Sequence, residues 1–424
     1  MSNGKSIVIF LREHLAMGGI EAYVYKQAKK LKETGNKVIW VKCPNALLDR
    51  SFEHVFYDGE TIIWNNKIDI EVIKKLSADY CRIIVIAFDM HQFSLAEDFK
   101  SKFNLCPVHT FYFVPHFVGD TLYLEEAYSG EKRERVRNRV SPIIKKMQDN
   151  GNVRYFGKMH VEKICSAYGI TIENPDDYKV PTSYFDEAPF DEKRCRDVYS
   201  RDKFNLVTVS RFEFPHKGYI LGLIKAYAVL KKDYPRLVLT IAGYGDGLAV
   251  IENLISSYDP YIKDDIHLIG QLSTEELKVF FDNAALNISV AGCCSQGARN
   301  GTLSIPARHY DYNCEVYGFM PDSANDTLSS REGDPVIPYI ERVLNMPEEE
   351  YVELCRRSFD YYKNIVDSNV GIDEIENVSE VNILSEKEIR YILNEERKRV
   401  IRSKFRALKR EIKALLPFNK NETN

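Results

Sequence analysis

The feature that most constrains the fold is a buried strand joined to an amphipathic helix by a turn that carries two cations. Residues 206–209 (LVTV) form a short, β-branched apolar run, which is typical of a buried strand. Gly218 can begin the turn into a helix, because apolar side chains recur at helical spacing over residues 220–230. Arg211 and Lys217 lie between the two elements. A strand, a loop and a helix in this order predict one unit of a parallel α/β sheet.

The two cations also indicate what this turn could bind. The first amide groups of a helix have no partner within the helix, and the helix dipole is positive at that end. Arg211 and Lys217 beside such a helix start favour an anion, and a phosphate or diphosphate fits best. The alternative is a solvated loop with two ordinary surface cations, and the spacing alone does not decide between them.

Four motifs, in order, resemble the retaining glycosyltransferases of family 4 (glycosyl transferases group 1), which have the GT-B fold. Ser-Arg-Phe-(x)4-Lys-Gly, ending at Gly218, resembles the donor-phosphate loop of that family. The resemblance continues through residues 237–247 (LVLTIAGYGDG) and 266–284, and it includes Gly18-Gly19-Ile20-Glu21 near the start of the chain. It implies two Rossmann-like domains that face a cleft, and a nucleotide diphosphate sugar as the donor.

The resemblance also implies a role for individual residues. Arg211 and Lys217 would stabilise the leaving diphosphate, helped by amides near Gly18 and Gly19. No Asp-x-Asp occurs in the chain, so we expect no metal ion on the diphosphate, and no cofactor besides the donor. The donor-binding residues that the resemblance implies are Gly18, Gly19, Arg211, Lys217, Gly243, Leu272, Gln296, Gly297 and Ser304.

A histidine is expected near the donor sugar. Residues 109–114 read as a strand, and the family commonly places a histidine after such a strand. His116 is the best match and a candidate catalytic residue, and His109 is the second choice. The alternative is a histidine that packs in the core beside the neighbouring aromatic residues.

One family motif is altered in this chain. The family has Glu-(x)7-Glu after the strand at residues 286–290, with one acid for the donor sugar and the other for the ribose. Here Gln296 takes the first position and Ser304 the second, and neither side chain carries a charge. The change suits an enzyme with weaker donor binding, a non-catalytic GT-B-like subunit that binds a glycan or a partner transferase, or a nucleotide-sugar epimerase of similar fold.

The length of 424 residues predicts more than one domain. We expect an acceptor-side domain over residues 1–190, a nucleotide-sugar domain over 204–345, returning helices over 346–395 and a basic tail over 396–424. Residues 175–205 are rich in proline and charge and predict the linker. Further strands are expected at 5–11, 38–41, 83–88, 237–242, 266–269 and 286–290, and helices at 20–35, 125–150, 274–283, 338–344 and 348–366.

The basic tail concentrates positive charge on an otherwise acidic chain. Residues 397–413 hold nine Lys or Arg against one acid, Glu411, whereas the whole chain has a net charge of −4. Ile401, Phe405 and Leu408 begin an apolar stripe at helical spacing. We predict a 397–416 helix that lies on an anionic membrane, which would suit a lipid-linked acceptor, and we expect no nucleic-acid partner. A helix docked on an acidic patch or on a partner protein is the alternative.

The compartment is predicted from cysteines and hydropathy. Nine cysteines without a Cys-x-x-Cys pair are typical of reduced thiols rather than a disulfide frame or a zinc site. No apolar run reaches the about 20 residues that cross a bilayer. We therefore expect a cytoplasmic protein, peripheral on the inner face of the membrane through its tail.

Overall fold

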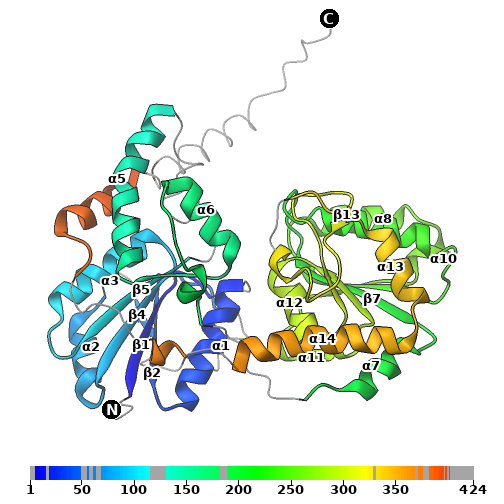
Figure 1. Cartoon of the computed structure of the whole chain (residues 1–424), viewed down its shortest axis with the longest axis horizontal. Coiled ribbons are helices and arrows are strands. Elements are labelled where there is room, and N and C mark those ends of the chain that lie inside the picture. The colour runs from blue at the N-terminus through cyan, green and yellow to red at the C-terminus, as the bar shows by residue number, and fades with distance from the viewer. Residues whose placement is uncertain are drawn as a thin grey trace, which may run out of the picture. The chain divides into compact units, whose positions relative to one another are not determined.

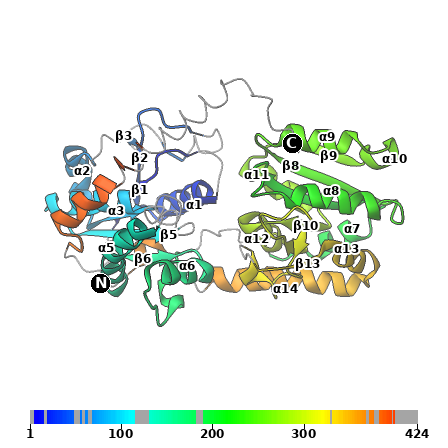
Figure 2. The same cartoon turned by 90° about the horizontal axis from the view of Figure 1, so that it is seen from above.

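The computed structural model describes residues 5–15, 19–48, 55–56, 61–63, 68–114, 130–181, 189–327, 331–367, 371–375, 382–395, 397–398 and 401. Its contacts divide the chain into two compact units (Figures 1 and 2). The first consists of Met1–Ser183 and Val370–Asn424, and the second of Tyr184–Asn369. The chain therefore leaves the first unit, builds the second without interruption and then returns.

The first unit is built on a six-stranded parallel sheet in the order β3-β2-β1-β4-β5-β6. The chain starts in the middle of the sheet and winds outward in both directions, which is the doubly wound arrangement. Its strands are β1 (Ser6–Leu11), β2 (Lys37–Lys42), β3 (Thr61–Ile63), β4 (Arg82–Ala87), β5 (Val108–Val114) and β6 (Val153–Tyr155). Its helices are α1 (Gly19–Glu33), α2 (Ile70–Leu76), η2 (Ser77–Asp79), α3 (Met90–Lys102), α5 (Gly130–Asp149), α6 (Lys158–Tyr168), η4 (Pro175–Tyr178) and η6 (Ile372–Glu374).

Alternate side chains of these strands enter two cores, one on each face of the sheet. In β1, Val8 and Phe10 pack with Leu31 of α1. Ile7 and Ile9 pack on the other face with side chains of α3, α5 and α6. A strand with helices on both faces must be apolar at almost every position, which explains the continuous apolar run at the start of the sequence.

The segment 382–395 belongs to the first unit although it follows the second in the chain. Glu97 of α3, whose side chain is buried, accepts hydrogen bonds from the backbone N–H of Ile383 at 2.6 Å and of Leu384 at 3.1 Å. Ile392 is fully buried in the core that α3 and α5 share. A buried carboxylate and an apolar contact therefore fix the returning chain to the first sheet.

The second unit is built on a five-stranded parallel sheet in the order β11-β10-β7-β8-β9, with a small antiparallel pair, β12-β13. Its strands are β7 (Phe204–Arg211), β8 (Leu237–Tyr244), β9 (Ile266–Gly270), β10 (Leu286–Ser289), β11 (Ser304–Pro306), β12 (Glu315–Val316) and β13 (Asp334–Pro335). Its helices are α7 (Glu192–Tyr199), α8 (Tyr219–Leu230), α9 (Leu248–Ser256), α10 (Pro260–Lys263), α11 (Thr274–Asp282), α12 (Ala291–Arg299), η5 (Ala324–Asp326), α13 (Val336–Asn345) and α14 (Glu348–Asp367).

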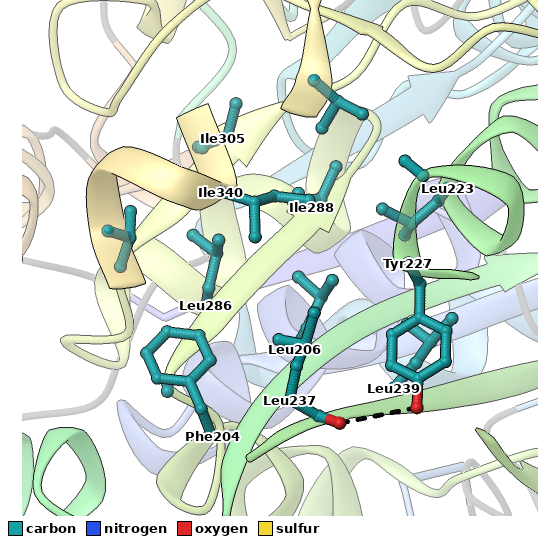
Figure 3. Close-up of a cluster of buried hydrophobic side chains, with 14 of the residues drawn as sticks. Phe204, Leu206, Leu223, Tyr227, Leu237, Leu239, Leu286, Ile288, Ile305 and Ile340 are labelled. Atoms are coloured by element: carbon teal, nitrogen blue, oxygen red, sulfur yellow. Dashed lines mark hydrogen bonds between the residues drawn. The ribbon is translucent and has the colours of Figure 1, made fainter. Parts of the chain in front are cut away.

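The main core of the second unit lies between its sheet and helices α8 and α13. Leu206 of β7 lies in one cluster with Leu223 of α8 and Ile340 of α13, and all three are fully buried (Figure 3). Tyr227 of α8 donates its buried hydroxyl to the carbonyl of Leu237 at 3.4 Å (Figure 3). The core therefore holds the start of α8, and with it the turn that precedes α8, in a fixed place on the sheet.

Helices α7 and α14 pack against each other in the second unit (Figure 1). Arg196 of α7 pairs with Glu348 of α14 at 2.7 Å, and the rings of Tyr199 and Tyr351 stack with centroids 4.4 Å apart. The helix predicted to return to the first domain, α14, thus lies in the second unit to its end. The segment 382–395 is the part that packs on the first unit.

The two doubly wound sheets confirm the predicted α/β fold class. Each predicted strand and helix in the described residues has a counterpart with slightly different bounds. The pattern missed several elements, among them β3, α2, α3, α7, α9, α10, α12 and β11. Helix α7 lies inside the predicted linker. The sequence pattern missed it because only Cys195, Val198 and Tyr199 of this charged helix are buried, which is too few to show a helical period. The predicted 397–416 helix falls outside the described residues, apart from isolated positions at its start.

Candidate functional site

The strand order of the second unit marks where a ligand is expected to bind. β8 and β9 lie on one side of β7, and β10 and β11 on the other, so the winding reverses between β7 and β10. Ligands of such sheets bind outside the carboxyl ends of the strands at this reversal. β7 and β10 are paired at two positions, the last being Val207 with Asn287, and then separate. Ser289 Oγ accepts a hydrogen bond from Val209 N at 3.1 Å and bridges the gap.

Arg211 and Lys217 both lie at this reversal. Arg211 is the last residue of β7, its side chain is 49% exposed, and its Nη1 lies 3.2 Å from Glu213 Oε1. An exposed pair of this kind contributes little to stability, so an incoming anion can replace Glu213. Lys217 is half-buried and directly precedes Gly218, the N-cap of α8. The structure therefore brings both predicted cations to one loop beside a helix N-terminus.

Lys217 carries a charge that no direct contact within the described residues neutralises. Among the residues that the structure describes, its Nζ has no hydrogen-bond or ion-pair partner. Burial lowers the pKa of Lys217 to about 8; the nearby Cys293 and Glu213 oppose this shift, and Arg211 adds to it. A half-buried ammonium without an acid is costly, and a bound anion would remove that cost. Lys217 is thus the residue that most clearly requires a ligand.

The loop between β8 and α9 is packed tightly against the cation loop. A Cβ on Gly243, whose φ is +154°, would lie 1.8 Å from the carbonyl oxygen of Ser210. Gly247 N donates to Phe212 O at 2.8 Å, which joins the two loops. Glycine is needed at position 243 because no side chain fits between adjacent strand ends. The predicted donor residue Gly243 therefore lies at the same edge of the sheet as Arg211 and Lys217.

Leu272 extends the same edge on its far side. It follows β9, is half-buried and precedes Ser273, the N-cap of α11. Ser273 N donates to Glu276 Oε2 at 2.7 Å, and Glu276 N donates to Ser273 Oγ at 3.2 Å, which completes a capping box. Leu272 is therefore held at the edge beyond β8, and it does not lie at the reversal point.

Ser304 lies apart from the other predicted donor-binding residues of the second unit. It is the first residue of β11, it is fully buried, and its Oγ donates to Thr302 O at 3.0 Å and accepts from Asn287 Nδ2 at 3.2 Å. The start of a parallel strand lies at the opposite edge from the strand ends. Residues 291–299 form α12, so the altered motif does not begin in a loop that leads into a helix. Ser304 therefore does not lie at the carboxyl ends of the strands in this structure.

Gln296 and Gly297 lie within α12. Gln296 is half-buried, so part of this residue is accessible to a ligand. A Cβ on Gly297 would lie 2.5 Å from Asn287 Nδ2 and 2.8 Å from Ser304 Oγ. Gly297 thus lets α12 pack closely on β10 and β11, so this glycine is explained by packing.

The first unit has a similar reversal between β1 and β4, but the cation there is already paired. Arg12 follows β1, and its Nη2 lies 2.6 Å from the buried Glu21 of α1. Gly19 opens α1, and a Cβ there would meet no atom within 4 Å, so packing does not require this glycine. Gly18 and His116 lie outside the described residues.

His109 does not reach the end of its strand. It is the second residue of β5 and lies beside Ile84 of β4, toward the amino ends of the strands. This position removes the second-choice histidine from the edge where a ligand would bind.

The sequence analysis missed three parts of this edge. Ser289 bridges β7 and β10, Cys293 lies near Lys217, and a hairpin over residues 308–315 reaches the cation loop, where Tyr310 N donates to His216 O at 3.0 Å. Of these three parts, only Ser289 had a signal in the sequence, because it is a serine at the end of a predicted strand. The hairpin contact joins residues that are about ninety positions apart, which no local pattern reveals.

The structure adds three observations on chemistry and compartment. Within the described ranges, no three His, Cys, Asp or Glu side chains gather in a way that could hold a metal ion. None of the nine cysteines forms a disulfide. In the same ranges, no helix is both long and apolar enough to cross a bilayer.

The family model described as "Glycosyl transferases group 1" matches residues 191–296, which include the cation loop and the strand reversal. The chain has the fold of Anabaena Alr3699/HepE, solved with UDP and glucose, with a TM-score of 0.53, 14% identity, and coverage of 85% of this chain and 97% of that one. This is the two-domain GT-B fold. A search of curated proteins found no match.

Two further solved structures are more distant. A trehalose-6-phosphate protein of E. coli with UDP-2-fluoro glucose has a TM-score of 0.48, 11% identity, and coverage of 85% of this chain and 96% of that one. S. aureus TarM, solved with UDP, has a TM-score of 0.48, 9% identity, and coverage of 92% of this chain and 100% of that one.

Proposed function

We propose that this chain, which matches the glycosyl transferases group 1 model over residues 191–296, transfers a sugar from a nucleotide diphosphate donor to a glycan, with retention of configuration and without a metal ion. The observation that carries the proposal is the half-buried ammonium of Lys217, which has no ion-pair partner among the described residues. It lies at the strand reversal, beside Arg211 and the N-terminus of α8. Positive charge of this density is needed where a diphosphate departs, because negative charge develops there in the transition state.

The proposed reaction uses these charges on the leaving group. The bond between the anomeric carbon and the β-phosphate oxygen breaks, and a new bond forms from that carbon to an acceptor hydroxyl. The hydroxyl approaches from the face that the diphosphate leaves, as retention in the family implies, and its proton passes to the departing phosphate oxygen. Arg211, Lys217 and the positive end of the α8 dipole stabilise the diphosphate throughout.

The order of the strands orients the proposed donor. The nucleotide would extend over the ends of β8 and β9, where Gly243 and Leu272 lie. The donor sugar would then lie on the other side of the diphosphate, toward β10 and Gln296 of α12. A uridine nucleotide is the first to test, because Alr3699/HepE, which shares the fold, was solved with UDP.

Calorimetric titration with UDP tests the site directly. We expect wild-type protein to bind UDP, and Arg211→Ala and Lys217→Ala each to weaken binding by about ten- to a hundredfold. Lys225→Ala, a cation in the body of α8 and away from the loop, is the matched control and should bind normally. Unchanged binding in both loop variants would overturn the assignment of the site.

A second candidate function is a non-catalytic subunit that binds a glycan or a partner transferase. It is favoured by the segment from Val290 to Pro306, which contains no Asp or Glu, so no carboxylate from it can hold the donor sugar or the ribose. Titration with UDP-sugars separates the two candidates. Turnover of any UDP-sugar supports the enzyme, and a lack of affinity for every nucleotide supports the subunit.

We also propose a lipid-linked acceptor in surface polysaccharide synthesis, reached through the basic tail at the inner face of the membrane. This proposal is supported by the segment 382–395, which is fixed to the first unit. The nine cations of residues 397–413 follow that segment directly in the sequence. Anionic lipids attract such clusters by about 1 kcal/mol per cation. Deletion after Asn394 should abolish binding to phosphatidylserine vesicles and leave binding of UDP unchanged. Equal vesicle binding by both forms would contradict the proposal.

A further inference from the structure

The hairpin 308–315 holds two exposed tyrosines next to the cation loop. Tyr310 is 62% exposed and Tyr312 is 44% exposed, and they flank the buried Asp311. Neither hydroxyl has a hydrogen-bond partner among the residues that the structure describes. Exposed aromatic side chains lose hydrophobic stabilisation unless something covers them, so two on one short hairpin require an explanation.

The backbone of this hairpin is fixed. Asp311 Oδ1 accepts from Asn313 N at 3.1 Å, and its Oδ2 accepts from Glu315 N at 2.7 Å. Arg308 N donates to Glu315 O at 2.8 Å, and their side chains form an ion pair at 2.5 Å. Four bonds within eight residues hold the tyrosines in place, so a ligand would meet a rigid surface.

Each tyrosine is supported from behind by a ring of the cation loop. The ring of Tyr310 lies nearly parallel to that of His216, with centroids 4.8 Å apart and an angle of 30°. The ring of Tyr312 lies 6.4 Å from Phe214 at 34°. His216 directly precedes Lys217, so the two tyrosines continue the proposed diphosphate site.

The backbone of Tyr310 is strained. Its φ is +59°, and among the described residues other than glycine only Ala291 and Cys314 also have a positive φ. Ala291 opens α12 and Cys314 closes the hairpin, so all three surround the same edge of the sheet. A left-handed tyrosine costs about 1 kcal/mol, and such strain is found most often where a side chain is held for binding.

The strand order indicates which part of a ligand would reach the tyrosines. The hairpin follows β11, whereas Gly243 and Leu272 follow β8 and β9 on the other side of β7. If the nucleotide lies over β8 and β9, the hairpin is on the sugar side of the diphosphate. An exposed tyrosine ring suits the C–H face of a pyranose, whose hydroxyls can bond the tyrosine hydroxyl.

We propose that Tyr310 and Tyr312 form a stacking surface for a pyranose ring, from the donor sugar or from the acceptor glycan. The proposal rests on the proposed function for its orientation, since it takes the diphosphate to lie at Arg211 and Lys217. It adds an aromatic determinant of sugar specificity to a site that is otherwise built of cations, glycines and amides.

The experiment compares sugars with and without the nucleotide. Wild type, Tyr310→Gly, Tyr312→Ala and the double variant are titrated with UDP, UDP-glucose, UDP-galactose and UDP-N-acetylglucosamine. The same proteins are examined by saturation-transfer NMR with methyl α-glucoside, methyl α-galactoside and N-acetylglucosamine. Glycine is used at position 310 because it adopts a φ of +59° without strain.

Tyr261→Ala is the matched control, because Tyr261 is 55% exposed on α10, a helix that leads into the start of β9 and so lies at the opposite edge. A second pair, Tyr310→Phe and Tyr312→Phe, keeps the rings and removes the hydroxyls. We expect the affinity for UDP to stay within about twofold in every variant. Loss of each ring should weaken pyranose binding by about three- to tenfold, and phenylalanine should restore most of it.

The outcomes separate the two sources of the pyranose. If the affinity for a UDP-hexose falls, the surface binds the donor sugar; if only the free pyranosides lose saturation transfer, it binds the acceptor. Equal losses for UDP and UDP-hexoses, or no change with any sugar, would overturn the proposal. Absence of UDP binding in wild type would instead refute the proposed function, and the pyranoside measurements would still test the tyrosines.

Discussion

The two units have the same kind of sheet but treat the cation at the reversal point in opposite ways. In the first unit Arg12 is paired at 2.6 Å with the buried Glu21. In the second unit Arg211 has an exposed partner at 3.2 Å, and Lys217 has no ion-pair partner among the described residues. The first arrangement neutralises its charge within the fold, and the second leaves positive charge for a ligand.

This difference shows that fold and charge are separate properties. Both units have a doubly wound sheet and therefore a reversal point, but a reversal point alone does not select an anion. An ion pair inside the protein must be broken before its cation can bind phosphate, whereas an uncompensated lysine gains from the phosphate. We therefore assign the anionic donor to the second unit.

The largest expected effect comes from removing the free cations. Arg211→Ala combined with Lys217→Ala should lower sugar transfer by about a thousandfold or more, because each donor of this kind contributes about 10²–10³ to turnover. The measurement is the transfer or hydrolysis of UDP-sugars under single-turnover conditions.

Arg12→Ala is the matched change in the first unit. It should leave UDP affinity within about threefold and lower the free energy of unfolding by about 1–3 kcal/mol, because Glu21 is left buried without its partner. A larger loss of UDP affinity from Arg12→Ala than from the pair in the second unit would break the comparison.

A second test concerns the tight edge of the second sheet. Gly243→Ala should lower the free energy of unfolding by about 3 kcal/mol, because its Cβ would lie 1.8 Å from Ser210 O. Urea denaturation measures the loss. Gly292→Ala is the control: a Cβ there meets no atom within 4 Å, so stability should change by less than about 0.5 kcal/mol.

A third test concerns how the first unit holds the returning chain. Glu97→Ala should lower the free energy of unfolding by about 2–3 kcal/mol, because the amides of Ile383 and Leu384 lose their acceptor. Hydrogen exchange of these two amides should accelerate at the same time. The neighbouring Asp98→Ala removes an exposed pair with Lys102 and should change little. Equal effects of the two changes would show that Glu97 does not fix this segment.

The smallest effect is a pH dependence. The pKa of Lys217 is lowered to about 8 in the folded protein, so the ammonium is present below that pH and is lost as the pH rises through it. UDP affinity should be constant between pH 6.5 and 7.5 and should fall by up to about tenfold per pH unit above 8. Calorimetry at several pH values measures it. Lys217→Arg keeps its charge, so a fall of the same size in that variant would refute this role for Lys217.

Much of this edge could be predicted from the sequence because it is local. The run from Leu206 to Leu230 contains a strand, a loop and a helix within one stretch, and its periodicity reports the burial of each part. Arg211 and Lys217 follow from their places in that stretch. The place of Ser304 could not be predicted in the same way. It depends on where α12 ends and β11 begins, and no periodicity in the sequence marks that boundary.

The sequence by itself determined two parallel α/β units and a loop with two cations before α8, since strand and helix patterns repeat over short distances. Only the tertiary structure decided that Arg12 has a buried partner and Lys217 does not, that Ser304 faces inward, and that Tyr310 rests on His216. The reason is physical. Whether a charge is compensated or a ring covered depends on residues distant in the chain, which the packing of the sheets and loops brings together.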